Sequence, residues 1–218
     1  MPLASGAAMR RTGPAGGLPV VCVNGGTGTV VPGDWSASIQ WLVERLAPEH
    51  PAIAFHEVRY RVKSWKHLDS CLEDAEAALD AAADPGGRRT LLLGFSMGGA
   101  VSIGVAGHPS VSTVVGLAPW IPARLDVGGM RGRRLAVIQG SLDGWIPGVP
   151  GVSPRSSRAG FERIHDMGVA AGYTLIRGGV HPIAFRWRGE RLVPAPRAAT
   201  WARLVGGELA RFQAEEGD

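Results

Sequence analysis

Short apolar runs alternate with longer segments of helical spacing along most of the chain. The apolar runs are continuous rather than interleaved with polar residues, which is typical of strands buried on both faces of a sheet. We expect such strands at 18–23, 52–60, 90–95, 111–117, 134–139 and 172–177. The segments between them carry apolar residues three and four positions apart, which predicts helices over 35–46, 65–83, 97–108, 155–168 and 197–214.

Strands that alternate with helices in this way form a parallel sheet with helices on both faces. The pattern therefore predicts one α/β domain over 18–218, with a sheet of about six strands. Residues 1–17 are rich in Gly, Ala and Pro, so we expect a flexible N-terminal arm there. Residues 183–193 are mixed in character and predict a small excursion or hairpin. The connection 118–133 is too short for a large cap domain.

Composition and charge narrow the possible functions. The chain has 218 residues, of which 45% are hydrophobic, and its formal net charge is +4. This length fits one domain with a sizeable core. The arginines are scattered, and no basic run is interleaved with aromatic residues, so we expect no binding of nucleic acid. No signal peptide or membrane-spanning segment is recognisable, and we expect a cytoplasmic protein without a membrane partner.

The two cysteines, Cys22 and Cys71, lie in different predicted elements and do not have the spacing of metal ligands. Buried free thiols in a reducing compartment are the simpler interpretation, and a single disulfide between them is the alternative. We predict no metal and no other cofactor.

The main candidate for chemistry is the stretch 91–99. A buried strand ends there in Gly94–Gly98, which reads Gly-Phe-Ser-Met-Gly, and continues into a helix of small residues. A serine on such a tight strand-to-helix turn lies in strained backbone and presents its hydroxyl above the sheet edge. The helix that begins after Ser96 offers unpaired N–H groups to a developing negative charge. A glycine-rich turn that only packs a helix on a strand is the alternative, and the flanking strand and helix favour a reactive serine.

Three further loops follow predicted strands at the same edge of the sheet, after Val23, Gln139 and Arg177. Ligand sites of open α/β sheets lie outside the carboxyl ends of the strands, so these loops are expected to meet the serine. A serine hydroxyl needs a base within hydrogen-bond reach. His181, in the last of these loops, is the candidate base. Three other histidines are expected at a helix terminus or at the surface: His50, His108 and His165.

These motifs resemble those of the α/β-hydrolase family, over the chain from about Leu18 to its end. Gly94–Gly98 matches the family's nucleophile motif, 140–147 resembles its acid loop, and 178–181 resembles the loop that carries its histidine. The order serine, aspartate, histidine is also the family's order. The resemblance implies Ser96 as nucleophile, His181 as general base and Asp143 as the acid that holds the imidazole. Asp126, one strand earlier, is the main alternative for the acid.

The small dienelactone-hydrolase-like esterases are the members that this chain resembles. The resemblance implies hydrolysis of a carboxylic ester or lactone through an acyl-enzyme intermediate. It also implies a small-molecule substrate and a monomer or homodimer. A thioesterase or acyltransferase of a biosynthetic pathway would carry the same three residues. A non-catalytic ligand-binding protein of the same fold is a further alternative.

The oxyanion hole is predicted from backbone N–H groups. Met97, directly after the nucleophile, supplies one donor, and Gly26 is the favoured source of the other. Many family members have His-Gly where this chain has Asn24 and Gly25. Because the donor is a backbone N–H, this change leaves the oxyanion chemistry in place. The family fold also usually opens with two antiparallel strands, which 1–17 are too short and too rich in Gly and Pro to supply.

The substrate pocket is predicted only in outline. Trp120 and Trp145 follow strand ends and are candidates to wall an acyl or aromatic group, with simple packing as the alternative. Arg59, Arg61 and Lys63 follow the second strand at the same sheet end. A solvated basic loop is the favoured interpretation, and the alternative is that these residues face the pocket and favour an anionic substrate.

Overall fold

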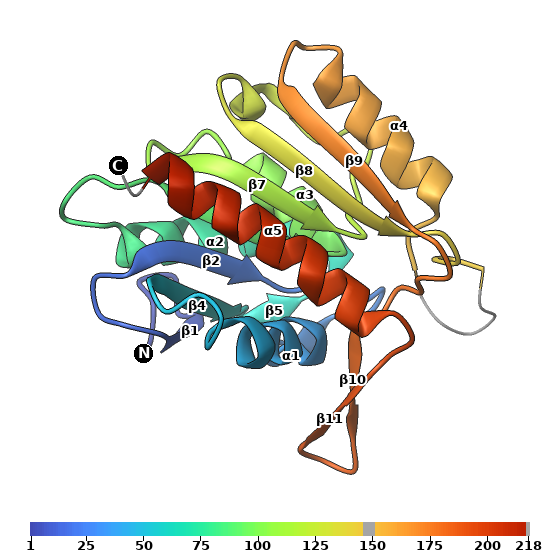
Figure 1. Cartoon of the computed structure of the whole chain (residues 1–218), viewed down its shortest axis with the longest axis horizontal. Coiled ribbons are helices and arrows are strands. Elements are labelled where there is room, and N and C mark those ends of the chain that lie inside the picture. Colours follow the sequence, from blue (N-terminus) through green and yellow to red (C-terminus); the bar gives the residue numbers. More distant parts are fainter. Residues whose placement is uncertain (146–150, 217–218) are drawn as a thin grey trace.

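The protein is described by a computed structural model, which covers residues 1–145 and 151–216. Its centre is a seven-stranded sheet in the order β1-β4-β2-β6-β7-β8-β9 (Figure 1). The strands are β1 (Ala8–Thr12), β2 (Leu18–Val23), β4 (Ile53–Arg59), β6 (Thr90–Phe95), β7 (Val111–Leu117), β8 (Arg134–Gly140) and β9 (Ala170–Ile176). All neighbouring pairs are parallel except β1 and β4. The six parallel strands predicted from the apolar runs are therefore confirmed.

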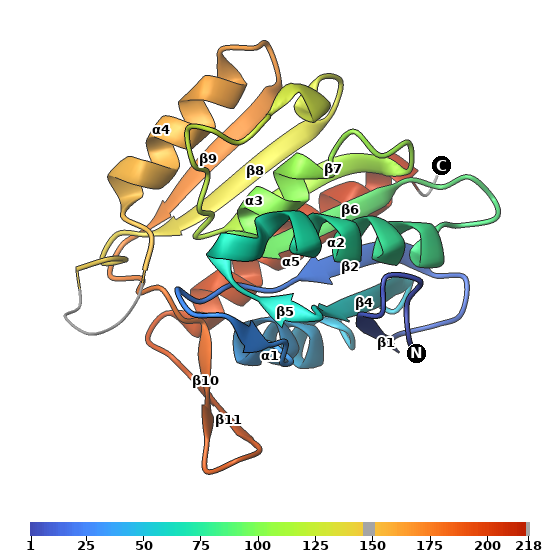
Figure 2. The ribbon, with the colours of Figure 1, turned by 180° about the vertical axis from the view of Figure 1, so that it is seen from behind.

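Helices cover both faces of this sheet (Figures 1 and 2). Helices α1 (Ala37–Leu46) and α5 (Ala198–Glu216) pack on one face, and α2 (Leu68–Ala82), α3 (Met97–Gly104) and α4 (Pro154–His165) pack on the other. Each face has its own apolar core, because a strand with side chains buried on both sides supplies both layers. Trp201 and Phe212 of α5 are fully buried in one core, and Leu79 of α2 is fully buried in the other. The single-domain α/β architecture predicted from the sequence is confirmed.

The prediction of a flexible arm over 1–17 is not what the structure shows. Residues Ala8–Thr12 form β1, which pairs antiparallel with β4 and raises the sheet to seven strands. Met9 is 2% exposed, and Arg10 makes two hydrogen bonds of 2.8 Å to the carboxylate of the buried Glu57. The Gly and Pro content of this segment concealed a five-residue strand whose pairing partner lies far away in the sequence. Only one of the family's two opening strands is thus recognisable in this sheet.

Shorter elements complete the described part of the chain. Strands β3 (Val31–Pro32) and β5 (Val62–Lys63) form a two-stranded pair, and the 3-10 helices Trp65–His67 and Gly128–Met130 lie in connections. Strands β10 (Ala184–Trp187) and β11 (Arg191–Pro194) form the hairpin expected near 183–193, and it projects away from the body of the molecule (Figure 1). No helix in the described ranges 1–145 and 151–216 combines the length and apolar character that crossing a bilayer requires.

Both cysteine thiols are free and buried, so the alternative of a disulfide between them does not hold. Cys22 lies in β2 and Cys71 in α2. Desolvation by burial raises the pKa of the Cys71 thiol to about 11, which keeps it protonated at neutral pH. Both residues are therefore small apolar components of the core.

We predict that Met9→Ala will lower the free energy of unfolding by about 2–5 kcal/mol, because it empties a packed site under β1. Urea denaturation followed by circular dichroism measures this change. Val30→Ala is the control, since Val30 is 55% exposed, and it should change the free energy by less than about 0.5 kcal/mol. A loss for Met9→Ala no larger than the control would mean that β1 does not contribute to the fold.

Candidate active site

Ser96 lies on the turn between β6 and α3 with φ 56° and ψ −117°. A positive φ is costly for a residue with a side chain, and such strain persists only where the surroundings hold it. The Ser96 N–H donates to the Leu117 carbonyl at 2.9 Å, and the Ser96 carbonyl accepts from the N–H groups of Gly99 and Trp120 at 2.9 Å. These three bonds fix the turn between two neighbouring strands of the sheet, as the sequence motif predicts.

The two glycines of the motif leave room for this turn. A Cβ on Gly98 would lie 2.5 Å from the Val23 carbonyl oxygen, and a Cβ on Gly94 would overlap the Gly98 carbonyl. Helix α3 therefore begins against the end of β2 with no space for a side chain at either position. This close approach brings the loop after β2 to the serine.

His181 connects the serine to an acid. It lies in the loop between β9 and β10, and its Nε2 is 3.0 Å from the Ser96 Oγ. Its Nδ1 is 2.8 Å from Oδ2 of Asp143. Because a carboxylate only accepts hydrogen bonds, the Nδ1 position carries the proton and Nε2 is left as an acceptor for the serine hydroxyl. The three residues predicted as nucleophile, base and acid are brought into one hydrogen-bonded line.

Asp143 is fully buried in the loop after β8, and its carboxylate has partners on both oxygens. Oδ1 accepts from the Val152 N–H at 2.8 Å, and Oδ2 accepts from the Gln139 Nε2 at 3.0 Å in addition to His181. Such partners offset the cost of removing a carboxylate from water. Asp126 is exposed and accepts from the Gly128 N–H at 2.8 Å, as the first residue of a local turn. Asp143, and not Asp126, therefore contacts the imidazole.

The loops of the acid and the histidine are joined by backbone hydrogen bonds. The Leu142 N–H donates to the Gly179 carbonyl, and the Ser141 N–H donates to the Ile176 carbonyl, each at 2.9 Å. These bonds continue the pairing of β8 and β9 beyond the strand ends, so the register of the sheet sets the distance between acid and base. The predicted acid loop was given as 140–147, of which 146–147 lie outside the described residues.

Gln139 is a member of this site that sequence reasoning missed. It is fully buried, and its Nε2 donates to Asp143 and, at 3.0 Å, to the Val152 carbonyl. It therefore fixes the carboxylate and the chain segment that caps it. The available signal was an amide at the end of an otherwise apolar strand, directly before the acid loop.

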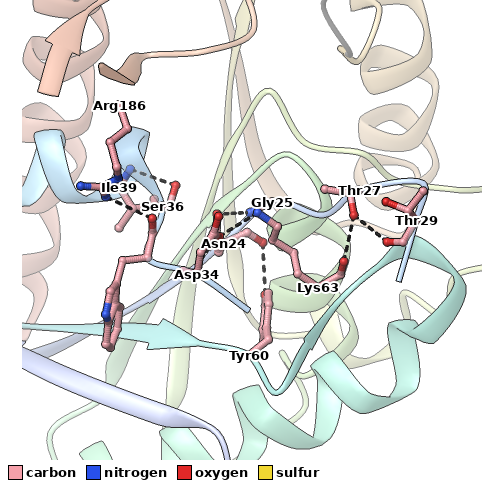
Figure 3. A network of polar contacts seen from close by, with 11 residues as sticks. Asn24, Gly25, Thr27, Thr29, Asp34, Ser36, Ile39, Tyr60, Lys63 and Arg186 are labelled. Carbon is pink, nitrogen blue, oxygen red and sulfur yellow. Dashed lines mark hydrogen bonds and ion pairs between the residues drawn. The ribbon is translucent and has the colours of Figure 1, made fainter. Parts of the chain in front are cut away.

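The loop after β2 is held by the side chain of Asn24, which is buried (Figure 3). Its Oδ1 accepts from the Gly25 N–H at 2.7 Å, and its Nδ2 donates to the Asp34 carbonyl at 3.1 Å. The Tyr60 hydroxyl donates to the Asn24 carbonyl at 3.2 Å. Desolvation by burial raises the pKa of Tyr60 well above its ordinary value, so the hydroxyl stays a donor. The asparagine thus braces the loop, a role that its position in the sequence did not disclose.

Gly26 and Met97 are adjacent in the structure. A Cβ on Gly26 would overlap the Met97 sulfur and would lie 2.7 Å from Trp65 Cδ1, so a larger residue would require these side chains to move. Met97 is the first residue of α3, where an N–H has no acceptor within the helix. Because Asn24 takes the Gly25 N–H, Gly26 supplies the next backbone N–H along the loop. Gly26 lines the same cavity as Ser96, and Met97 directly follows Ser96 in the chain. The assignment of their N–H groups as oxyanion donors remains a prediction.

A cavity of about 780 Å³ opens over Ser96 and His181. This volume lies within the range of small-molecule sites. Its walls combine small and polar residues with five aromatic side chains, those of Phe95, Trp35, Trp65, Trp120 and Phe185. Trp120 thus has the predicted place beside the serine. Trp145 does not line this cavity and is 76% exposed.

Of the three basic residues at and after the end of β4, Arg59, Arg61 and Lys63, only Lys63 lines the cavity, and it pairs with Asp34 at 2.7 Å. The Arg61 guanidinium is turned to Glu73 and Asp74, and Arg59 lies over the ring of Trp35. The less favoured interpretation, that these residues face an anionic substrate, therefore applies only to Lys63. Within 1–145 and 151–216, no group of three or more His, Cys, Asp or Glu side chains has the arrangement of a metal site.

Comparisons with known proteins establish the fold. No family model and no curated protein matches the sequence. Several solved structures match in three dimensions. An esterase/lipase from an uncultured bacterium has a TM-score of 0.69 and 16% identity, over 98% of this chain and 84% of that one. The Pyrobaculum calidifontis esterase has a TM-score of 0.67 and 16% identity, over 99% and 83%.

A dienelactone hydrolase-like promiscuous phosphotriesterase from metagenomic libraries has a TM-score of 0.65 and 16% identity, over 96% of this chain and 95% of that one. At such identities the similarity defines the fold and not the activity. The chain therefore has the α/β-hydrolase fold, as its motifs predicted.

We predict that Asp143→Asn will change the tautomer or the orientation of the His181 ring, because the carboxylate that accepts the Nδ1 proton is removed. Nitrogen-15 NMR of the imidazole groups near neutral pH reports which ring nitrogen is protonated. Asp126→Asn is the matched control and should leave the His181 signals unchanged, since Asp126 binds only within its own turn. If Asp126→Asn moved these signals and Asp143→Asn did not, the described hydrogen bond would be wrong.

Proposed function

We propose that the protein is a serine hydrolase that cleaves a carboxylic ester or lactone through an acyl-enzyme intermediate. The observation that carries this proposal is the hydrogen-bonded line from Ser96 through His181 to the buried Asp143, with Ser96 and His181 open to the cavity. An activated serine requires a base in contact with its hydroxyl and a third group that orients the base. The similar solved structures, which include esterases and a dienelactone hydrolase, support the same class.

In the proposed reaction, Oγ of Ser96 attacks the substrate carbonyl carbon while its proton passes to Nε2 of His181. Asp143 stays ionised and stabilises the imidazolium through the Nδ1–H hydrogen bond. The imidazolium then protonates the leaving alkoxide, which departs as an alcohol and leaves the acyl group on the serine. Water, deprotonated by His181, attacks the acyl carbonyl, and the serine regains its proton when the carboxylic acid is released.

The negative charge of both tetrahedral intermediates would be placed at the start of α3. We assign the N–H groups of Met97 and Gly26 as its donors. The Asn24 contact supports this assignment, because it occupies the Gly25 N–H and holds the loop against Asp34 and Tyr60. A donor fixed before the reaction needs no reorganisation when charge develops, which is the main source of its effect.

Labelling with a fluorophosphonate probe tests the nucleophile. The probe phosphonylates an activated serine, so we expect stoichiometric labelling of the wild type and none of Ser96→Ala, as measured by intact mass. Ser102→Ala is a matched control, because Ser102 is buried on the same helix and lies outside the cavity. Folded wild-type protein that resists several such probes would favour a ligand-binding protein over an enzyme.

Turnover measurements test the acid, and a substrate panel separates an esterase from a thioesterase or an acyltransferase. Asp143→Asn should slow turnover by about 1,000- to 10,000-fold, as loss of the acid does in other triads. A panel of p-nitrophenyl esters, lactones and acyl thioesters, with and without acceptor alcohols, identifies the preferred acyl donor and acceptor. Strong preference for a thioester or for transfer to an alcohol would replace the esterase assignment without changing the triad.

Asn24→Ala should lower kcat by about 10- to 100-fold with little change in KM, which is less than the 100- to 1,000-fold typical of losing an oxyanion donor outright. The reason is that the substitution loosens the loop that carries Gly26 without removing its N–H. Steady-state kinetics on a p-nitrophenyl ester measure both constants. Thr27→Val, on the same loop, is the control and should retain most of the kcat. Equal losses in both variants would indicate a general effect of the loop rather than a specific effect of Asn24.

A further inference from the structure

The β10–β11 hairpin has one apolar face that the rest of the described chain leaves largely exposed. In its register Phe185 lies opposite Val193 and Trp187 lies opposite Arg191. Residues that pair across two strands, and those two apart on one strand, share a face, so these four side chains form one surface. Phe185 is 46% exposed and Trp187 is 61% exposed. We call the side chains of Phe185, Trp187, Arg191 and Val193 the hairpin face.

The opposite face of the hairpin is attached to the body of the protein. Arg186 donates to the Gln40 side chain at 2.9 Å and to the Trp35 carbonyl at 3.3 Å. The Ser38 hydroxyl accepts from the Ala184 N–H at 3.3 Å. These contacts fix the base of the hairpin on α1 and on the segment before it. The hairpin projects from the body of the molecule (Figures 1 and 2).

The hairpin is also cationic. Between Ala184 and Pro194 there are three arginines, Arg186, Arg188 and Arg191, and one acidic residue, Glu190. Tryptophan favours the boundary between lipid headgroups and hydrocarbon, because its ring is apolar and its N–H is polar. Arginine near the same boundary is attracted to anionic headgroups. Exposed aromatic rings and excess positive charge on one projecting element match an anionic lipid surface.

We propose that the hairpin face docks the protein on the surface of an anionic lipid bilayer. In this arrangement Phe185 and Trp187 lie at the headgroup boundary, while Arg188 and Arg191 face the headgroup charges. Such binding requires no membrane-spanning helix. It departs from the expectation of no membrane partner, which rested on the lack of a spanning or export segment.

The hairpin also borders the cavity over Ser96. Phe185 and Arg186 line this cavity and also line a separate hollow on the hairpin. Docking would therefore bring the mouth of the cavity to the lipid surface. Esters dissolved in the bilayer would then enter the cavity directly from the lipid. This consequence rests on the proposed function, whereas the docking itself does not.

A second copy of the chain fits the hairpin face less well. A hairpin of two four-residue strands presents a face roughly 13 Å long and 10 Å wide, given ordinary strand spacings. A stable protein interface buries about 800 Å² on each partner, several times the area of such a face. Two hairpins in contact would also oppose like charges. A lipid surface does not have these restrictions, because it adapts to the element that inserts.

Co-sedimentation with sucrose-loaded vesicles tests the proposal. The protein is mixed with vesicles of phosphatidylcholine alone or of phosphatidylcholine with phosphatidylglycerol, and the bound fraction is measured at low and at physiological salt. We expect binding to the anionic vesicles that weakens with salt. Trp187→Ala and Arg191→Glu should each weaken this binding by about tenfold or more. Both variants should retain wild-type hydrolysis of a short soluble ester, because neither residue lines the main cavity.

Matched controls define the outcomes that would overturn the proposal. Arg131→Glu makes the same charge change at an exposed site away from the hairpin, and it should leave most of the binding intact. Equal losses in Arg131→Glu and Arg191→Glu would show diffuse attraction of a basic protein instead of docking. Ser96→Ala should bind vesicles like the wild type, which separates docking from catalysis. No binding to anionic vesicles, or a dimer in light scattering that Trp187→Ala abolishes, would also contradict the proposal.

Discussion

The positive φ at Ser96 is the constraint on which the rest of the site depends. A side chain accepts this conformation only where the turn is held on every side, and here the carbonyl of Leu117 and the N–H groups of Gly99 and Trp120 hold it. The turn can form because Gly98 lets α3 approach the end of β2. One strained residue therefore fixes the relative positions of three strands at the edge where the cavity opens.

A second constraint is the burial of the Asp143 carboxylate. A buried charge is tolerated only with partners, and this one is bound by His181, by the Gln139 amide and by the Val152 N–H. These partners come from β8 and from two loops, so the charge ties together the segments that build the site. The same contacts that satisfy the carboxylate also orient the imidazole toward Ser96. Stability and the proposed chemistry are therefore served by one set of hydrogen bonds.

The loop after β2 and the β10–β11 hairpin both border the cavity. Near the loop after β2, Asn24, Asp34, Tyr60 and Lys63 form a polar network that braces the backbone (Figure 3). Aromatic rings occur at both places, with Trp65 against Gly26 of this loop and Phe185 on the hairpin. The braced loop suits a backbone donor site, and the aromatic rings suit an apolar group of a substrate. The hairpin thus extends the cavity wall to the outer surface of the molecule.

The sequence by itself determined the six parallel strands, the order of the helices and the edge where the loops meet, because continuous apolar runs and helical spacing are local signals. From the Gly-Phe-Ser-Met-Gly motif, the loops at that edge and the resemblance to the α/β-hydrolase family, it also predicted Ser96 and His181. For the acid it favoured Asp143, with Asp126 as the alternative. The tertiary structure decided what depends on distant partners. Strand β1 exists through its pairing with β4, Asp143 rather than Asp126 reaches the imidazole because β8 and β9 are paired in one register, and Trp145 lies outside the cavity that Trp120 lines. No local pattern contains that information, since it arises only when segments far apart in the chain pack against one another.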